Sequence, residues 1–120
     1  MEEINLRNYA YLGDAVWELY IREITIMQTN NAKKLHQITT DLVKTHTQFE
    51  LLHFIEDKLT PEEQDIAKRA RNLPIPVGRR NIQTEYRQAT AFEALIGWWY
   101  INNKGRLNKI LETINNKINQ

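Results

Sequence analysis

The 120-residue chain has no cysteine, only four glycines and three prolines. The lack of cysteine excludes a disulfide framework and a thiolate metal site. No run approaches the roughly 20 apolar residues of a membrane span, and the acidic Met1-Glu2-Glu3 start is unlike a signal peptide. We therefore expect a cytoplasmic protein with no membrane partner.

The length and composition are those of one globular domain. Hydrophobic residues make up 42% of the chain and charged residues 26%, which is typical of a folded protein rather than a disordered one. A chain of this size buries enough surface for one core but is too short to divide in two. We expect residues 1–120 to form a single domain.

Charge is unevenly distributed, although the net charge is only +1. One stretch carries six cations against a single acid, Glu85. The cations are Lys68, Arg69, Arg71, Arg79, Arg80 and Arg87. An acidic cluster, formed by Glu56, Asp57, Glu62, Glu63 and Asp65, precedes it. A protein polarised in this way is expected to bind phosphate on one surface only.

The apolar residues recur at spacings of three and four, which predicts an all-α fold of about six to seven helices. There is no convincing alternating strand pattern and no hairpin signal. Thr60, Pro61 and the two acids that follow mark a helix start. The expected helices run over about residues 6–27, 35–43, 49–55, 60–71, 84–102 and 107–118. The second and third of these are either continuous or broken near Thr45. Residues 115–117 are expected to form a frayed tail.

Two apolar helical segments each contain one carboxylate. Tyr11 to Leu19 surrounds Asp14, and Ala91 to Tyr100 surrounds Glu93. Because an unpaired buried carboxylate costs several kcal/mol, Asp14 must be paired, metal-bound or at a cleft. Gly13 costs a helix about 1 kcal/mol relative to Ala, so it predicts close approach of another backbone. The two carboxylates, far apart in sequence, could meet.

The same two segments resemble the signature helices of the ribonuclease III catalytic domain. The matching motifs are Leu12-Gly13-Asp14-Ala15-Val16 and Phe92-Glu93-Ala94-Leu95-Ile96-Gly97. The resemblance covers nearly the whole chain and is to the small relatives called Mini-ribonuclease III, which lack a separate double-stranded RNA-binding domain. Further matching segments are Lys34-Leu35-His36, residues 43–48, Arg69-Ala70-Arg71-Asn72 and Tyr86-Arg87.

This resemblance implies an endonuclease for double-stranded RNA that depends on Mg²⁺, with Mn²⁺ as a substitute. It also implies a homodimer in which two catalytic centres each cut one strand and leave a short 3′ overhang. The small relatives are associated with maturation of the large-subunit (23S) ribosomal RNA precursor, and a ribosomal protein is a further expected partner.

Asp14 and Glu93 are the expected catalytic residues and metal ligands. Magnesium prefers oxygen ligands and keeps several waters, so one or two carboxylates suffice. From the residues alone, each carboxylate could instead pair with a buried arginine or cap a helix. Larger members of the family have further acids where this chain has Arg7, Ala10 and Thr90. Glu18 is expected to pair with Arg22, four residues on.

The basic stretch is the expected contact with RNA. Duplex RNA presents phosphates and 2′-hydroxyls across a shallow minor groove, so its recognition needs cations and short polar groups. Arg79 and Arg80, beside prolines and a glycine, are the leading candidates. The supporting candidates are Arg69, Arg71, Asn72, Gln83 and Arg87. The alternative is a solvated cationic face that pairs with the acidic cluster.

Two other functions stay open from the sequence. One is a catalytically weak or inactive homodimer that binds structured RNA, and the other is a helical dimerisation module with no RNA partner. The tryptophans at 17, 98 and 99 and Tyr100 are expected in the core or an interface, because duplex RNA does not expose its base faces. His53, on an apolar face, is expected to be a core residue.

Overall fold

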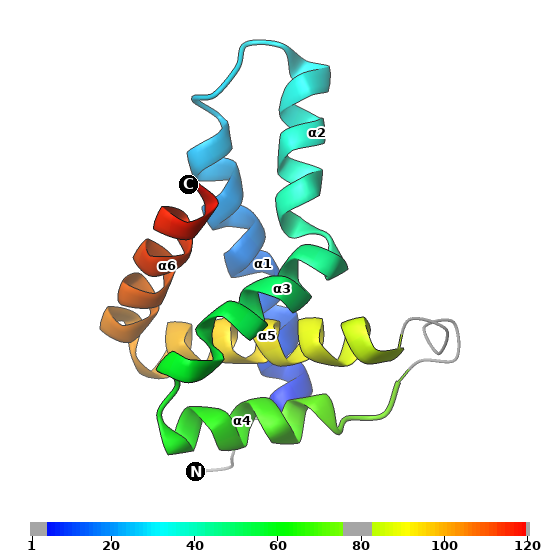
Figure 1. The fold of residues 1–120 in the computed structure, drawn as a ribbon, viewed down its shortest axis with the longest axis vertical. Coiled ribbons are helices and arrows are strands. Elements are labelled where there is room, and N and C mark those ends of the chain that lie inside the picture. Colours follow the sequence, from blue (N-terminus) through cyan, green and yellow to red (C-terminus); the bar gives the residue numbers. More distant parts are fainter. Residues whose placement is uncertain (1–4, 76–82, 120) are drawn as a thin grey trace.

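The computed structural model describes residues 5–75 and 83–119, which form six α-helices and one short 3₁₀ helix and contain no strand (Figure 1). This confirms the predicted all-α fold. The helices are α1 (Leu6–Thr25), α2 (Ala32–Val43), α3 (Thr45–Ile55), the 3₁₀ helix η1 (Glu56–Lys58), α4 (Pro61–Arg71), α5 (Gln83–Asn102) and α6 (Lys104–Ile118). No helix in these ranges is long and apolar enough to cross a membrane.

Polar caps explain where four of these helices begin. The side chains of Asn5, Asn31 and Asn103 accept hydrogen bonds from backbone N–H groups in the first turns of α1, α2 and α6. Thr60 and Glu63 form a reciprocal capping box at the start of α4. Each cap satisfies backbone donors that a helix start leaves without an internal partner.

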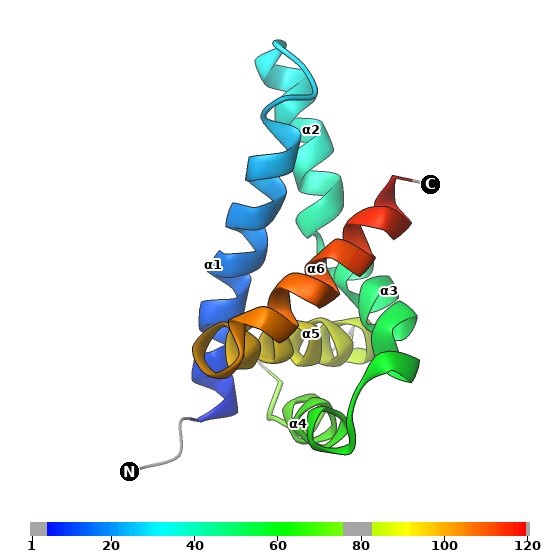
Figure 2. The same cartoon turned by 90° about the vertical axis from the view of Figure 1, so that its left-hand side faces the viewer.

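Helix α5 lies at the centre of the molecule, with α1 crossing it and α3, α4 and α6 packed around it (Figures 1 and 2). Three large aromatic side chains, Trp17, Phe92 and Trp99, are completely buried there. Trp17 meets Phe92 edge to face, with ring centroids 5.1 Å apart. The segment 84–102 is therefore the central helix of the fold.

Several boundaries differ from the prediction, since α2, α3 and α6 begin three or four residues earlier than expected. Helix α1 ends at Thr25 rather than Met27, where the chain turns back toward α2 and the Thr25 hydroxyl bonds to that of Thr39 (3.0 Å). The predicted frayed tail is wrong, since the last helix continues to Ile118, which packs against the core. Lys44, in extended backbone, separates α2 from α3 and so settles the break left open near Thr45.

The expectation that His53 is a core residue is wrong. Its side chain is 83% exposed and lies 3.7 Å from Glu56. Helix α3 buries the stripe formed by residues 48, 51, 52 and 55, and His53 falls outside it. Trp17 and Trp99 are buried as expected, whereas Tyr100 is 38% exposed.

Candidate active site

Helices α1 and α5 touch backbone to backbone at two glycines. A Cβ added to Gly13 would overlap the carbonyl oxygen of Glu93 and lie 2.9 Å from the nitrogen of Gly97. A Cβ added to Gly97 would overlap the carbonyl oxygen of Tyr9. The close approach predicted from Gly13 is confirmed. Because Asp14 follows Gly13 and Glu93 precedes Gly97 by one turn, this contact sets the two carboxylates side by side.

Asp14 and Glu93 form a carboxyl pair joined by a side-chain hydrogen bond. Asp14 is exposed, whereas Glu93 is partly buried. Burial, followed by the hydrogen bond to Asp14 and its negative charge, raises the pKa of Glu93 to about 9. A hydrogen bond from Gln48 acts in the opposite direction. Burial and the neighbouring carboxyl group therefore both favour the protonated form of Glu93 at neutral pH.

The donor set fits a hard divalent cation. Asp14 raises the pKa of Glu93, and a cation held between the two carboxyl groups would offset the repulsion between their negative charges. Across residues 5–75 and 83–119, no group of three or more His, Asp or Glu side chains is placed to hold a metal. A site with two protein carboxylates suits Mg²⁺, which keeps several waters and completes its octahedron with substrate oxygens.

Three of the residues expected to contact RNA lie at the end of α4. Arg69 is exposed, with its guanidinium 3.6 Å from Asp65. Arg71 lies 3.9 Å from Glu56. Arg69 and Arg71 therefore both pair with the acidic cluster, as the alternative to RNA binding predicted. Asn72 is exposed at the carboxyl end of the helix.

Arg87 and Gln83 lie at the start of α5, against that same end of α4. Arg87 Nη1 donates to the carbonyl oxygens of Arg71 (2.7 Å) and Leu73 (3.4 Å). When the Gln83 amide is oriented so that its oxygen faces donors, this oxygen accepts a hydrogen bond from Arg87 Nη2 at 3.0 Å. Arg87 thus joins α4 to α5. The leading candidates, Arg79 and Arg80, lie outside the described residues.

A small hollow lies among these cations. It is lined by Arg7, Arg71, Arg87 and Thr90, among others. Arg7 Nη2 donates to the carbonyl oxygen of Pro74 at 3.2 Å across it. Since Thr90 lies one turn before Glu93, the hollow borders the carboxylates. Arg7 and Thr90 stand at two positions where larger family members have acids, so this chain has a cation and a hydroxyl there.

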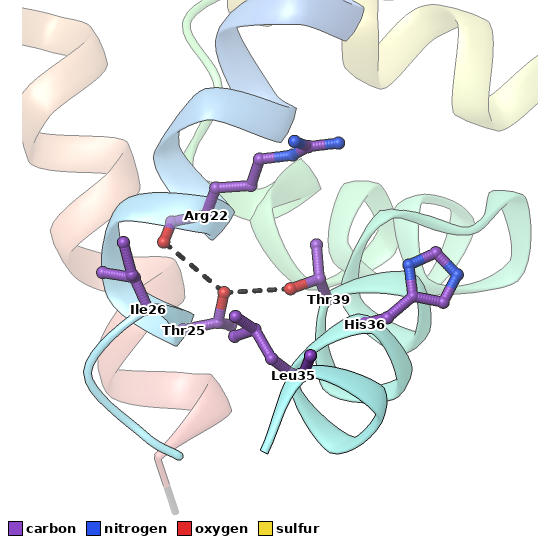
Figure 3. Close-up of a pocket in the computed structure, with 7 residues that line it drawn as sticks. Arg22, Thr25, Ile26, Leu35, His36 and Thr39 are labelled. Atoms are coloured by element: carbon purple, nitrogen blue, oxygen red, sulfur yellow. Dashed lines mark hydrogen bonds between the residues drawn. The ribbon is translucent and has the colours of Figure 1, made fainter. Parts of the chain in front are cut away.

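A second hollow lies between the far ends of α1 and α2, away from the carboxylates (Figure 3). Thr25 and Thr39 meet in it, while His36 extends outward. None of its lining residues is a carboxylate, so it offers a metal no acidic ligand. Arg22, on its edge, lies 3.5 Å from Glu18, which confirms the expected pair.

Sequence reasoning missed two buried polar residues. Gln48 contacts Glu93, and Glu63 is held by Arg106 and Trp99. A signal for Gln48 was present, because it occupies the first position of an apolar stripe in α3 that continues at residues 51, 52 and 55. Glu63 was predicted as part of a helix start, which the capping box confirms, and of the acidic cluster, but its burial was not predicted.

Comparison with known proteins places this geometry in a family. The sequence profile described as Ribonuclease III domain matches residues 7–104, a span that includes both carboxylates. The chain belongs to the ribonuclease III domain family. This confirms the resemblance drawn from the two motifs and the predicted enzyme class, an endoribonuclease of the ribonuclease III type.

Relatives extend the family match over most of the chain. It is 39% identical over 111 residues to a Mini-ribonuclease 3 of Gloeobacter violaceus, covering 92% of this chain and 82% of that protein. It is 41% identical over 106 residues to a Mini-ribonuclease 3 of a Thermoanaerobacter species, covering 86% and 75%. A crystal structure of a Fusobacterium nucleatum protein superposes with a TM-score of 0.85 at 30% identity, covering 95% of both chains.

Proposed function

We propose that this ribonuclease III family member cuts double-stranded RNA in a Mg²⁺-dependent reaction, with Asp14 and Glu93 as the metal ligands and catalytic residues. The observation that carries the proposal is the carboxyl pair at the α1–α5 crossing, where Glu93 stays protonated unless a cation replaces the proton. Mn²⁺, which also accepts oxygen ligands, is expected to substitute.

Each side chain has a distinct part in the proposed reaction. When bound, the cation activates a water for attack on phosphorus and stabilises charge on the leaving 3′ oxygen. Asp14, being exposed, presents its carboxylate to solvent and substrate. Glu93, partly buried on the central helix, supplies an oxygen whose position is fixed by the packed core.

The proposed RNA contact begins at the hollow beside the carboxylates. Arg71 and Arg87 line this hollow. Each guanidinium has five N–H donors, and the contacts with Glu56 and with the carbonyl oxygens at the end of α4 use only some of them. Arg69 and Asn72 are exposed next to it, and Gln83 bonds to Arg87. The proposal extends this surface to Arg79 and Arg80, which stay predictions. Such contacts suit a duplex read by its backbone.

The proposed functional unit is a homodimer that meets along α1. Tyr11, Ala15 and Leu19 are exposed and lie on one helical stripe, with Tyr11 85% and Leu19 61% exposed. Leu19 lines a hollow together with Tyr100, which continues this apolar surface onto α5. An apolar surface of this kind is typical of a protein interface. A second copy would bring a second carboxyl pair to a shared duplex.

For the natural substrate we propose the precursor of large-subunit (23S) ribosomal RNA, acted on in the cytoplasm, with a ribosomal protein as a partner. The support is the resemblance to Mini-ribonuclease III. A direct check is the length of 23S rRNA ends in cells that lack the protein. Unprocessed ends are expected, and they should be restored by the wild type but not by Glu93→Gln.

The decisive experiment incubates a long perfect RNA duplex with wild type, Glu93→Gln and Glu62→Gln, each with Mg²⁺ or with chelator. Glu62 is an exposed acid on α4 and serves as the matched control. We expect Mg²⁺-dependent fragments with 3′ overhangs from wild type and Glu62→Gln, and none from Glu93→Gln. Cleavage that persists in chelator would contradict metal dependence. An intact duplex that shifts on a native gel would favour RNA binding without cleavage.

The dimer is tested by sedimentation of Leu19→Glu, which places a charge on the apolar stripe. We expect a monomer that keeps its helical content. Gln37→Glu adds the same charge to an exposed position on α2 and should leave the dimer intact. A wild-type protein that sediments as a monomer at all concentrations would rule out the proposed assembly.

A further inference from the structure

Gln48 is a buried amide on α3 that lies next to the carboxyl pair. Its residue is only 3% exposed, and it shares the buried face of α3 with Leu51, Leu52 and Ile55. An amide in such a position is costly unless its polar atoms are paired. The question is therefore what the side chain bonds to.

Its donor group reaches two acceptors on different elements. Gln48 Nε2 donates to the carbonyl oxygen of Val43, the last residue of α2, at 3.3 Å. Gln48 also hydrogen-bonds to the side chain of Glu93 on α5. An amide nitrogen has two hydrogens, which is enough to donate to both acceptors. The amide is thus held by the end of α2 while it holds Glu93.

We propose that Gln48 is a positioning residue that fixes the orientation of the Glu93 carboxylate for a cation shared with Asp14. This inference rests on the proposed function. Residues that bond to a metal ligand from behind set its orientation, and their loss weakens metal affinity. Gln48 bonds to the Glu93 side chain from the buried face of α3, and a carboxylate has further acceptor sites that a cation can take.

The chemistry of the amide suits this role better than a charged donor would. An arginine or lysine beside Glu93 would neutralise the carboxylate and compete with the cation for it. A third carboxylate would add repulsion to a pair that already keeps a proton. The amide donates a hydrogen bond without carrying charge, so Glu93 stays oriented and still attracts a cation.

The test compares Gln48→Met with Thr25→Val. Methionine has a similar length and no N–H, so it removes the hydrogen bond with little change in volume. Thr25 is completely buried and bonds to Thr39, so valine removes a buried polar contact of similar kind far from the carboxylates. Both variants should lose similar stability, which thermal unfolding measures.

The deciding readout is Mn²⁺ affinity without RNA, measured from the free Mn²⁺ signal in electron paramagnetic resonance. We expect Gln48→Met to bind about 10- to 100-fold more weakly than wild type, and Thr25→Val to match wild type. A folded Gln48→Met protein with wild-type affinity would overturn the inference. A wild type that neither binds Mn²⁺ nor cleaves RNA would instead overturn the proposed function.

A second measurement needs no variant, so it tests the proposal even if the Gln48→Met protein fails to fold. The side-chain NH₂ resonances of Gln48 are followed by nuclear magnetic resonance in the wild type while Mg²⁺ is added. We expect them to shift together with the backbone resonances of Glu93. If the Glu93 signals move and those of Gln48 stay unchanged, Gln48 does not act on the cation site.

Discussion

Glu63 and Glu93 are both glutamates on helices of the core, but their neighbours differ in kind. The oxygens of Glu63 accept from Arg106 at 2.9 and 3.0 Å, from the Trp99 indole at 2.8 Å and from the Thr60 backbone at 2.9 Å. Glu93 instead faces a second carboxylate, Asp14, and one neutral amide.

The difference appears in the acidity of the two groups. Burial by itself pushes the pKa of Glu63 up, but Arg106, Thr60 and Trp99 together bring it below its ordinary value. Burial raises the pKa of Glu93 as well, and Asp14 adds to that rise. A buried acid with a full set of donors stabilises the fold, whereas one that faces another acid is, on the proposed function, a site for a cation. The following changes test this distinction, beginning with the largest expected effect.

Removing one member of the carboxyl pair should abolish function without harming the fold. Asp14→Asn keeps the size of an exposed side chain but removes a metal ligand. We expect cleavage of duplex RNA to fall by at least about 1000-fold, which corresponds to roughly 4 kcal/mol of transition-state stabilisation. Single-turnover cleavage and circular dichroism measure the two properties. An Asp14→Asn protein with normal cleavage would remove Asp14 from the mechanism.

The opposite outcome is expected at Glu63. Glu63→Gln leaves the Arg106 guanidinium without its carboxylate, and breaking such a buried pair costs about 3 kcal/mol in the free energy of unfolding. Urea unfolding measures the loss, with exposed Glu62→Gln as the control. Cleavage per folded molecule should stay at the wild-type level. A fully stable Glu63→Gln protein that fails to cleave would erase the distinction between the two glutamates.

Glu93→Gln should stabilise the metal-free protein in a pH-dependent way. Below the ordinary pKa of 4.5, Glu93 is protonated in both folded and unfolded chains. Between 4.5 and about 9 it ionises only when the chain unfolds, so wild-type stability falls as pH rises through this window.

Glutamine removes this dependence. In chelator, we expect the melting temperature of Glu93→Gln to exceed that of wild type by at least about 5 °C at pH 8, since each kcal/mol of stability shifts the melting temperature by roughly this amount. The two curves should meet near pH 4.5. A constant offset at every pH would mean that Glu93 is not held in its protonated form.

A partly exposed glutamate sets the lower limit of the comparison. Glu85 lies 2.7 Å from His46, and their side chains are 38% and 52% exposed, respectively. We expect Glu85→Gln to change the free energy of unfolding by less than about 0.5 kcal/mol, as is usual for exposed pairs. Urea unfolding at neutral pH measures this. A loss as large as that of Glu63→Gln would show that exposure is a poor guide to the role of an acid in this protein.

The two sites also show what sequence could predict. Asp14 and Glu93 were predicted because each interrupts an apolar helical run, and Gly13 indicated that two backbones meet there. The start of α4 was predicted because the capping signal lies within four consecutive residues. These features are local, or they leave a local trace in the pattern of apolar residues.

The features that were missed depend on contacts between distant segments. Glu63 finds Arg106 only when α6 lies across α4, and nothing near either residue marks the other as its partner. Arg87 was predicted to bind RNA from its charge, but two of its contacts are carbonyl oxygens at the end of α4. Whether the basic residues also contact RNA stays a prediction.

The glycine contact between α1 and α5 has a consequence for a chain that is still being synthesised. Asp14 leaves the ribosome about 80 residues before Glu93, and nothing else in the described part of the chain brings a second acid to it. A nascent chain whose α5 is still in the exit tunnel therefore has only one carboxyl group of the pair. On the proposed function, cleavage begins only after α5 has packed against α1 and the two glycines have met.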